Sequence, residues 1–178
     1  IEGGDSEVGI ESTIVDLSRF SLGHGVALLR PGGISASALV RVLGEPLKGT
    51  DDQAPRVSGS LKAHYSPHTP IRLYSLKQLV QDALAWLDQN TGTVAVVLRQ
   101  CELGAIQELA TNQRISISVL PDDAAGYARA LYACLRALDR GGFVELRWAK
   151  VPPEPEWAGV ADRLSRAAAA FADSRPNH

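Results

Sequence analysis

The chain has 178 residues, of which 45% are hydrophobic and 21% are charged, and its formal net charge is −2. This balance is typical of a folded globular protein and excludes a disordered chain. The overall basic charge that attracts nucleic acid over long distances is missing, so we expect no strong direct nucleic-acid binding. The longest apolar runs are far shorter than the roughly 20 residues that cross a bilayer, which excludes a membrane span.

Two cysteines, Cys101 and Cys134, lie far apart without CxxC spacing. This arrangement favours buried, reduced thiols in a cytoplasmic protein over a disulfide framework. The chain contains no methionine and begins with Ile1-Glu2. We therefore expect the natural protein to begin upstream of residue 1.

The first 50 residues predict two strands and one helix. Residues 8–17 are rich in β-branched side chains and predict a strand, with the polar triplet Glu11-Ser12-Thr13 in its buried middle. Residues 26–29 predict a second strand that ends at Arg30 in a Pro-Gly-Gly turn. A short helix follows, with these candidate caps: Ser35 or Ser37, and Gly44. So few elements cannot fold alone, so we expect them to complete a larger sheet.

Residues 51–70 lack hydrophobic periodicity and are rich in proline and glycine, which predicts an irregular linker or a lid. His64 and His68 have a spacing that would suit metal ligands on a helix. Pro67 breaks such a helix, and no third ligand is evident. We expect no metal ligands in this chain.

From residue 71 onward strands and helices alternate, which predicts a small three-layer domain with a mainly parallel sheet. The expected strands cover residues 71–74, 94–98, 115–120 and 143–146. The expected helices cover residues 76–89, 102–110, 123–139 and 160–172. The last helix contains three charged residues close together: Asp162, Arg163 and Arg166. A solvated charged face or an ion pair accounts for them at least as well as a binding surface does.

Three strings in this order, VGIESTIVDL, LLRPGGIS and LKAHYSPHTP, resemble the later half of the YrdC-like catalytic domain and the linker of the long L-threonylcarbamoyladenylate synthases. YARALYACLRALDRGG and GVADRLSRAA resemble helices of that family's carboxyl-terminal Rossmann-like domain. The resemblance implies that residues 1–50 end a YrdC-like α/β domain, 51–70 form a linker or lid, and 71–178 form the Rossmann-like domain. It extends over nearly all of the chain but not over the family's own beginning.

That family is a group of nucleotidyltransferases that join L-threonine, bicarbonate and ATP into threonylcarbamoyl-AMP and pyrophosphate, usually with Mg²⁺, for tRNA threonylcarbamoyladenosine modification. The resemblance implies that Thr13 binds L-threonine with Ser12 beside it, and that Arg30 and Tyr65 bind ATP. It also implies possible partner proteins in tRNA modification. Because the lysine, arginine and serine motifs of the family's first half are absent, we expect the chain alone to be inactive.

Each of these residues also has a simpler structural interpretation. The hydroxyls of Ser12 and Thr13 can bond to neighbouring backbone, Arg30 can cap carbonyls after a strand, and Tyr65 can anchor a linker. For the whole chain, the alternative function is a non-catalytic Rossmann-like module that binds a ligand or a regulatory partner protein. The sequence assigns no catalytic residue to residues 71–178.

Overall fold

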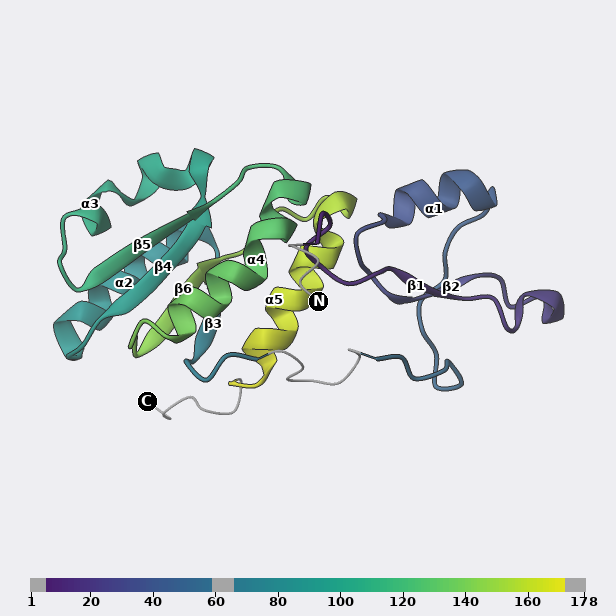
Figure 1. The fold of residues 1–178 in the computed structure, drawn as a ribbon, viewed down its shortest axis with the longest axis horizontal. Coiled ribbons are helices and arrows are strands. Elements are labelled where there is room, and N and C mark those ends of the chain that lie inside the picture. Colours follow the sequence, from purple (N-terminus) through teal and green to yellow (C-terminus); the bar gives the residue numbers. More distant parts are fainter. Residues whose placement is uncertain (1–5, 59–65, 172–178) are drawn as a thin grey trace, which may run out of the picture.

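The computed structural model describes residues 6–58 and 66–171. Figure 1 shows a larger α/β part and a smaller part, which contains a two-stranded sheet and a helix. Helices α4 (Ala124–Asp139) and α5 (Ala158–Ala169) of the larger part lie on the side that faces the smaller one (Figure 1). Contacts between the two parts run through these two helices and through the 3-10 turn η3 (Pro155–Trp157), which packs against the helix of the smaller part.

The smaller part is an antiparallel pair of strands followed by a helix. Strand β1 (Ile14–Asp16) pairs with β2 (Ala27–Arg30), and a 3-10 turn, η1 (Phe20–Leu22), lies between them. The strand expected over residues 8–17 is therefore much shorter. Glu11-Ser12-Thr13 precedes it, so the prediction of a buried mid-strand triplet is wrong: Gly9 has a left-handed φ of 76°, and Ile10 and Glu11 pack toward α4 and α5 instead of joining the ladder.

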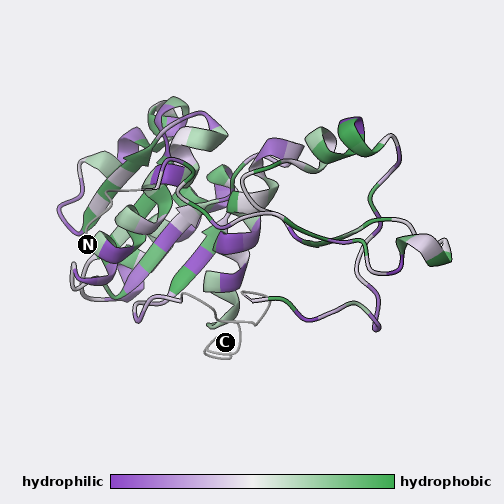
Figure 2. Ribbon diagram, turned by 45° about the vertical axis from the view of Figure 1, so that its right-hand side comes forward, coloured by the Kyte–Doolittle hydropathy of each residue, from purple (hydrophilic) through white to green (hydrophobic). Residues whose placement is uncertain are grey.

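Helix α1 (Ala36–Leu43) confirms the predicted caps. Ser35 Oγ accepts a hydrogen bond from the N–H of Ala38 at 3.2 Å, and Gly44 ends the helix with φ of 74°. No residue of α1 is buried. Figure 2 shows apolar residues on this helix, and several large apolar side chains of the smaller part are exposed: Leu17, Phe20, Leu22, Ile34, Val42 and Leu43. These elements therefore leave much apolar surface in water.

The larger part contains a four-stranded sheet whose pairs are all parallel, in the order β3-β6-β4-β5. Its strands are β3 (Ile71–Tyr74), β4 (Val94–Arg99), β5 (Ile115–Leu120) and β6 (Glu145–Ala149). Its helical elements are α2 (Leu76–Gln89), η2 (Gln100–Ile106), α3 (Gln107–Ala110), α4 (Ala124–Asp139), η3 (Pro155–Trp157) and α5 (Ala158–Ala169).

Two apolar clusters cover the two faces of this sheet. One packs α4 and α5 against it around Leu131, Trp148 and Leu164, and the other packs α2, η2 and α3 against it around Leu79 and Leu98. This arrangement confirms the predicted three-layer α/β domain with a parallel sheet. The helix expected over residues 102–110 is mostly 3-10, and the last helix begins two residues earlier than expected.

Strand β6 continues to residue 149, beyond the expected end at residue 146. The residue that follows the expected end is charged, Arg147. Arg147 is only 3% exposed, forms an ion pair with Glu145 at 2.9 Å, and stacks on the rings of Tyr74 and Trp86 at 5.4 and 5.6 Å. These contacts accommodate its charge inside the sheet, which a hydropathy pattern does not report.

Both cysteines are free. Cys134 is partly buried, but Cys101 is exposed at the start of η2, so the prediction of two buried thiols is wrong for Cys101. Within residues 6–58 and 66–171, the helices are too short or too polar to cross a bilayer.

Candidate functional site

Arg30, at the end of β2, contacts Ser12 directly. Its Nε and Nη2 donate to the Ser12 carbonyl oxygen at 3.2 and 2.9 Å, and Nη2 also approaches Ser12 Oγ at 3.3 Å. Its Nη1 donates to the carbonyl oxygen of Ser58 at 2.7 Å. The structure thus brings together Ser12 and Arg30, two of the residues that the sequence singled out. Arg30 also joins them to Ser58, in the connection between the two parts.

Arg30 is 6% exposed as a whole residue and forms no ion pair with a carboxylate among the described residues. Its hydrogen bonds go to neutral carbonyl oxygens, as in the simpler interpretation of a capping arginine. Burying a cation without a counter-charge is costly. An anion such as a phosphate would supply the missing charge, and the planar guanidinium is well suited to bind one.

The side chain of Thr13 is hydrogen-bonded to the backbone of Ile34, two residues before α1. Its Oγ1 donates to the Ile34 carbonyl oxygen at 2.7 Å and accepts from the Ile34 N–H at 3.0 Å. A hydroxyl has one donor and two acceptor positions, so one lone pair is left for a ligand. The role of Thr13 toward L-threonine stays a prediction, and Tyr65 lies outside the described residues.

Gly32 brings these segments into backbone contact. A side chain at Gly32 would collide with backbone atoms of Glu11, Ser12 and Thr13. Only glycine permits so close an approach. Residues 11–13 and 30–34 therefore form one compact unit, in which Ser12, Thr13 and Arg30 lie close together.

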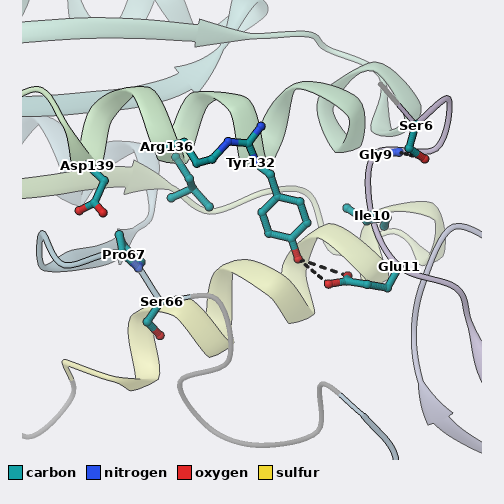
Figure 3. Close-up of a pocket in the computed structure, with 10 residues that line it drawn as sticks. Ser6, Gly9, Ile10, Glu11, Ser66, Pro67, Tyr132, Arg136 and Asp139 are labelled. Carbon is teal, nitrogen blue, oxygen red and sulfur yellow. Dashed lines mark hydrogen bonds between the residues drawn. The ribbon is translucent and has the colours of Figure 1, made fainter. Parts of the chain in front are cut away.

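A second cluster, absent from the sequence prediction, joins this unit to the α/β part. Tyr132 of α4 donates its hydroxyl to the two carboxylate oxygens of Glu11 at 3.0 and 3.2 Å (Figure 3). Arg163 of α5 donates Nε to Glu11 Oε2 at 2.5 Å and Nη1 to the Pro31 carbonyl oxygen at 2.8 Å. The sequence left open a solvated face, an ion pair or a binding surface for Arg163, and the structure places it in ion pairs with Glu11 and Asp162.

The charges in this cluster are matched. Burial opposes the charge on Glu11, but the hydrogen bonds and the positive charge of Arg163 outweigh burial and hold the pKa of Glu11 below its usual value. Burial and the neighbouring Glu11 carboxylate raise the pKa of Tyr132 above its usual value. Glu11 is therefore ionised and Tyr132 neutral near pH 7, as their hydrogen bonds require.

A cavity of about 460 Å³ lies beside this cluster, between residues 6–11, residues 66–67 and α4. Its walls include Ile10, Tyr132 and Leu135, and Figure 3 shows Asp139 and Pro67 away from the Glu11 end. Asp139 Oδ1 accepts from the Thr69 N–H at 2.7 Å, and its Oδ2 lies 3.1 Å from His68 Nδ1. Burial opposes the charge on Asp139, but these hydrogen bonds outweigh it and lower the pKa of Asp139 to about 2.

Histidine, cysteine, aspartate and glutamate side chains form no group of three or more that could hold a metal ion in the part of the chain that the structure describes. Mg²⁺ in nucleotide-using enzymes commonly binds one or two carboxylates and substrate phosphates. The described contacts of Arg30 and Ser12 include no carboxylate that could bind this ion.

The fold and these contacts define a parallel α/β domain that supports a separate strand-pair unit carrying a buried, anion-suited arginine. A family model described as "Threonylcarbamoyl-AMP synthase, C-terminal domain" matches residues 34–169, and the chain belongs to this family. The threonylcarbamoyl-AMP synthase of Pyrococcus abyssi (strain GE5 / Orsay) is 24% identical, over 94% of this chain and 48% of that protein. The chain thus spans about half the length of this curated relative.

Two solved structures share the fold. The crystal structure of P. abyssi Sua5 complexed with L-threonine has a TM-score of 0.71 and 23% identity, and the match covers 94% of this chain and 48% of the other. A variant of P. abyssi Sua5, with an adjacent histidine and tyrosine replaced by alanine, has a TM-score of 0.68 and 22% identity over 93% and 47%. At these identities the likeness establishes the α/β fold.

Proposed function

We propose that this chain is the later half of a threonylcarbamoyl-AMP synthase, a nucleotidyltransferase that acts in tRNA threonylcarbamoyladenosine modification. The family match over residues 34–169 and the alignment with half of the P. abyssi enzyme support this assignment. The substrates would be L-threonine, bicarbonate and ATP, and Mg²⁺ would enter with the ATP phosphates. Residues 1–50 would end a YrdC-like domain, and residues 51–70 would be its linker or lid.

The buried Arg30 guanidinium in contact with Ser12 carries the proposal at the level of residues. It has no carboxylate partner among the described residues, so the ATP phosphates would supply its counter-charge. Ser12 and Thr13, on the neighbouring segment, would contact L-threonine, the amino acid in the P. abyssi Sua5 complex. Catalysis would then consist mainly of positioning the reactants and stabilising phosphate charge.

Tyr65 would complete the nucleotide site from the linker. The chain contains one adjacent histidine-tyrosine pair, His64-Tyr65. A His-Tyr pair was replaced in the P. abyssi Sua5 variant, which supports a role for such a pair in this family. We propose that Tyr65 contacts ATP.

The exposed apolar residues of the smaller part support an incomplete catalytic domain. Side chains such as Phe20, Leu22 and Val42 are 52%, 73% and 86% exposed. An upstream half would bury these side chains and add the missing strands to the sheet. The chain alone would therefore be inactive. We place the complete enzyme in the cytoplasm, where partner proteins of tRNA modification would act with it.

The test is threonine-dependent pyrophosphate release from ATP and bicarbonate, assayed for this chain and for the longer protein that includes the upstream half. We expect release by the longer protein and none by the chain alone. In the longer protein, Arg30→Ala should raise the KM for ATP by roughly ten-fold or more. Arg56 is an exposed arginine of the connection, and Arg56→Ala is the control. This substitution should leave the KM for ATP unchanged. Turnover by the chain alone, or an unchanged KM in Arg30→Ala, would contradict the proposal.

A further inference from the structure

Arg163 of α5 contacts both backbone segments that carry the candidate ligand-binding residues. Its Nε reaches the carboxylate of Glu11, which directly precedes Ser12, and its Nη1 reaches the carbonyl oxygen of Pro31, which directly follows Arg30. The residue is 6% exposed. One buried guanidinium in the α/β part thus holds two separate loops of the smaller part.

These contacts close a circuit of covalent and hydrogen bonds. From Arg163 the circuit passes to Glu11, through the peptide bond to Ser12, and across to Arg30 by the 2.9 Å hydrogen bond. The next peptide bond leads to Pro31, whose carbonyl oxygen returns to Arg163 at 2.8 Å. A closed circuit restrains all of its members, so a displacement of Arg163 is transmitted both to the segment of Ser12 and to the segment of Arg30.

Neighbouring contacts leave this circuit little freedom. Tyr132 binds both carboxylate oxygens of Glu11, and Asp162 pairs with Arg163 at 2.7 Å. A side chain at Gly159 would lie 2.7 Å from the Gly32 carbonyl oxygen, so α5 approaches the turn after Arg30 as closely as glycine allows. The unit that carries the ligand-binding residues is therefore seated directly on α4 and α5.

We propose that Arg163 is a positioning residue for the threonylcarbamoyl-AMP synthase reaction, acting through Glu11 and the Pro31 carbonyl to set the separation of the L-threonine and ATP subsites. This inference rests on the proposed function and gives the α/β domain a role in that site. L-threonine, bicarbonate and ATP can be joined only if the L-threonine and ATP subsites are correctly spaced, and a displacement of about 1 Å can cost roughly a hundred-fold in rate.

The first experiment uses this chain as it is. Hydrogen-deuterium exchange of residues 11–17 and 28–34 is compared between the unchanged chain, Arg163→Ala and Arg72→Ala. Arg72→Ala is the matched control, because it removes a partly buried arginine-glutamate pair of 2.7 Å in the same α/β domain. We expect about ten-fold faster exchange in both segments for Arg163→Ala and no change for Arg72→Ala. If the two variants exchange at equal rates in these segments, Arg163 does not restrain them and the inference is wrong.

The second experiment uses the longer protein and measures kcat and the KM for L-threonine and for ATP. Arg163→Ala should raise both KM values by roughly ten-fold or more and lower kcat, whereas Arg72→Ala should lower the melting temperature but leave both KM values unchanged. Arg163→Lys keeps the charge but cannot bridge Glu11 and Pro31 together, so it should give intermediate values. If Arg163→Ala does not fold, Glu11→Gln, which keeps the side-chain volume, should raise both KM values in its place.

The outcomes separate this inference from the proposed function. If the unchanged longer protein releases no pyrophosphate, the proposed function fails, and the exchange experiment still tests the restraint. If that protein is active and the Arg163 and Glu11 variants keep its KM values, the positioning role fails while the proposed function stands.

Discussion

The carboxylate of Asp139, in the last turn of α4, accepts a hydrogen bond from the backbone N–H of Thr69 at 2.7 Å, across 70 residues of chain. The same carboxylate lies 3.1 Å from His68 Nδ1. Asp139 therefore fixes the point at which the connection enters β3.

Replacing Asp139 by Asn should destabilise the protein by roughly 1 kcal/mol at pH 7, because a partly exposed interaction of this kind is weakened by solvent. The pKa of Asp139 is about 2 in the folded protein, below the unfolded value of about 3.9. Its stabilisation is therefore complete above the unfolded pKa and is lost as the pH falls through about 2. Urea denaturation at pH 7 and pH 2 checks this: the difference between Asp139→Asn and the unchanged chain should shrink to a small fraction of its pH 7 value at pH 2, where about half of the folded chains still carry the charge.

Asp88→Asn is the control for that measurement, since Asp88 is an exposed aspartate on α2. Asp88→Asn should change the free energy of unfolding by no more than about 0.5 kcal/mol, relative to the unchanged chain, at both pH values. A pH-independent loss in Asp139→Asn would show that packing, and not the charge, is the cause.

Gly32→Ala should displace the segment of Ser12 and Thr13, because the new methyl group would collide with backbone atoms of residues 11–13. We expect a loss of about 1–3 kcal/mol in the free energy of unfolding, as for other overpacked positions. Gly49→Ala has no heavy atom near the added carbon and should be close to neutral. Denaturant titration of the two variants measures the contrast, and equal stability would mean that the backbone yields without cost.

Val42→Glu should distinguish the isolated chain from the complete enzyme. Val42 is 86% exposed on α1, so the substitution should change the stability of this chain by no more than about 0.5 kcal/mol. In the longer protein, an upstream half packed on α1 would bury the new charge, and threonine-dependent pyrophosphate release should fall. Val144→Glu, at a valine of the α/β part that is 47% exposed, is the control and should leave activity unchanged. If the Val42→Glu enzyme keeps full activity, the upstream half does not pack on α1.

Arg147→Lys should destabilise the α/β part by about 1–2 kcal/mol although the charge is kept. The guanidinium stacks on Tyr74 and Trp86, and an ammonium group loses this planar contact. Arg140→Lys, at an exposed position after α4, is the matched control. Thermal unfolding followed by circular dichroism compares the two, and equal melting temperatures would mean that the stacking contributes nothing measurable.

The elements of the α/β part could be predicted from local pattern. The apolar run at 94–98, the periodicity of residues 76–89 and the glycines at 141–142 indicate a strand, a helix and a turn at the places where the structure has them. Side-chain periodicity and turn chemistry act over a few residues, so a short window of sequence contains them. The predicted caps of α1 are confirmed for the same reason.

The sequence by itself determined that strands alternate with helices after residue 71 and that Ser12 and Arg30 belong to neighbouring segments of one family pattern. Only the tertiary structure decided that Glu11 turns toward α4 and α5, that Arg30 is bound to carbonyl oxygens, and that Arg163 is buried between two loops. A charged residue on a helix can be solvated or paired, and its own neighbours in sequence are the same in both cases. The choice depends on partners more than a hundred residues away, which only the packing of the two parts brings within hydrogen-bonding distance.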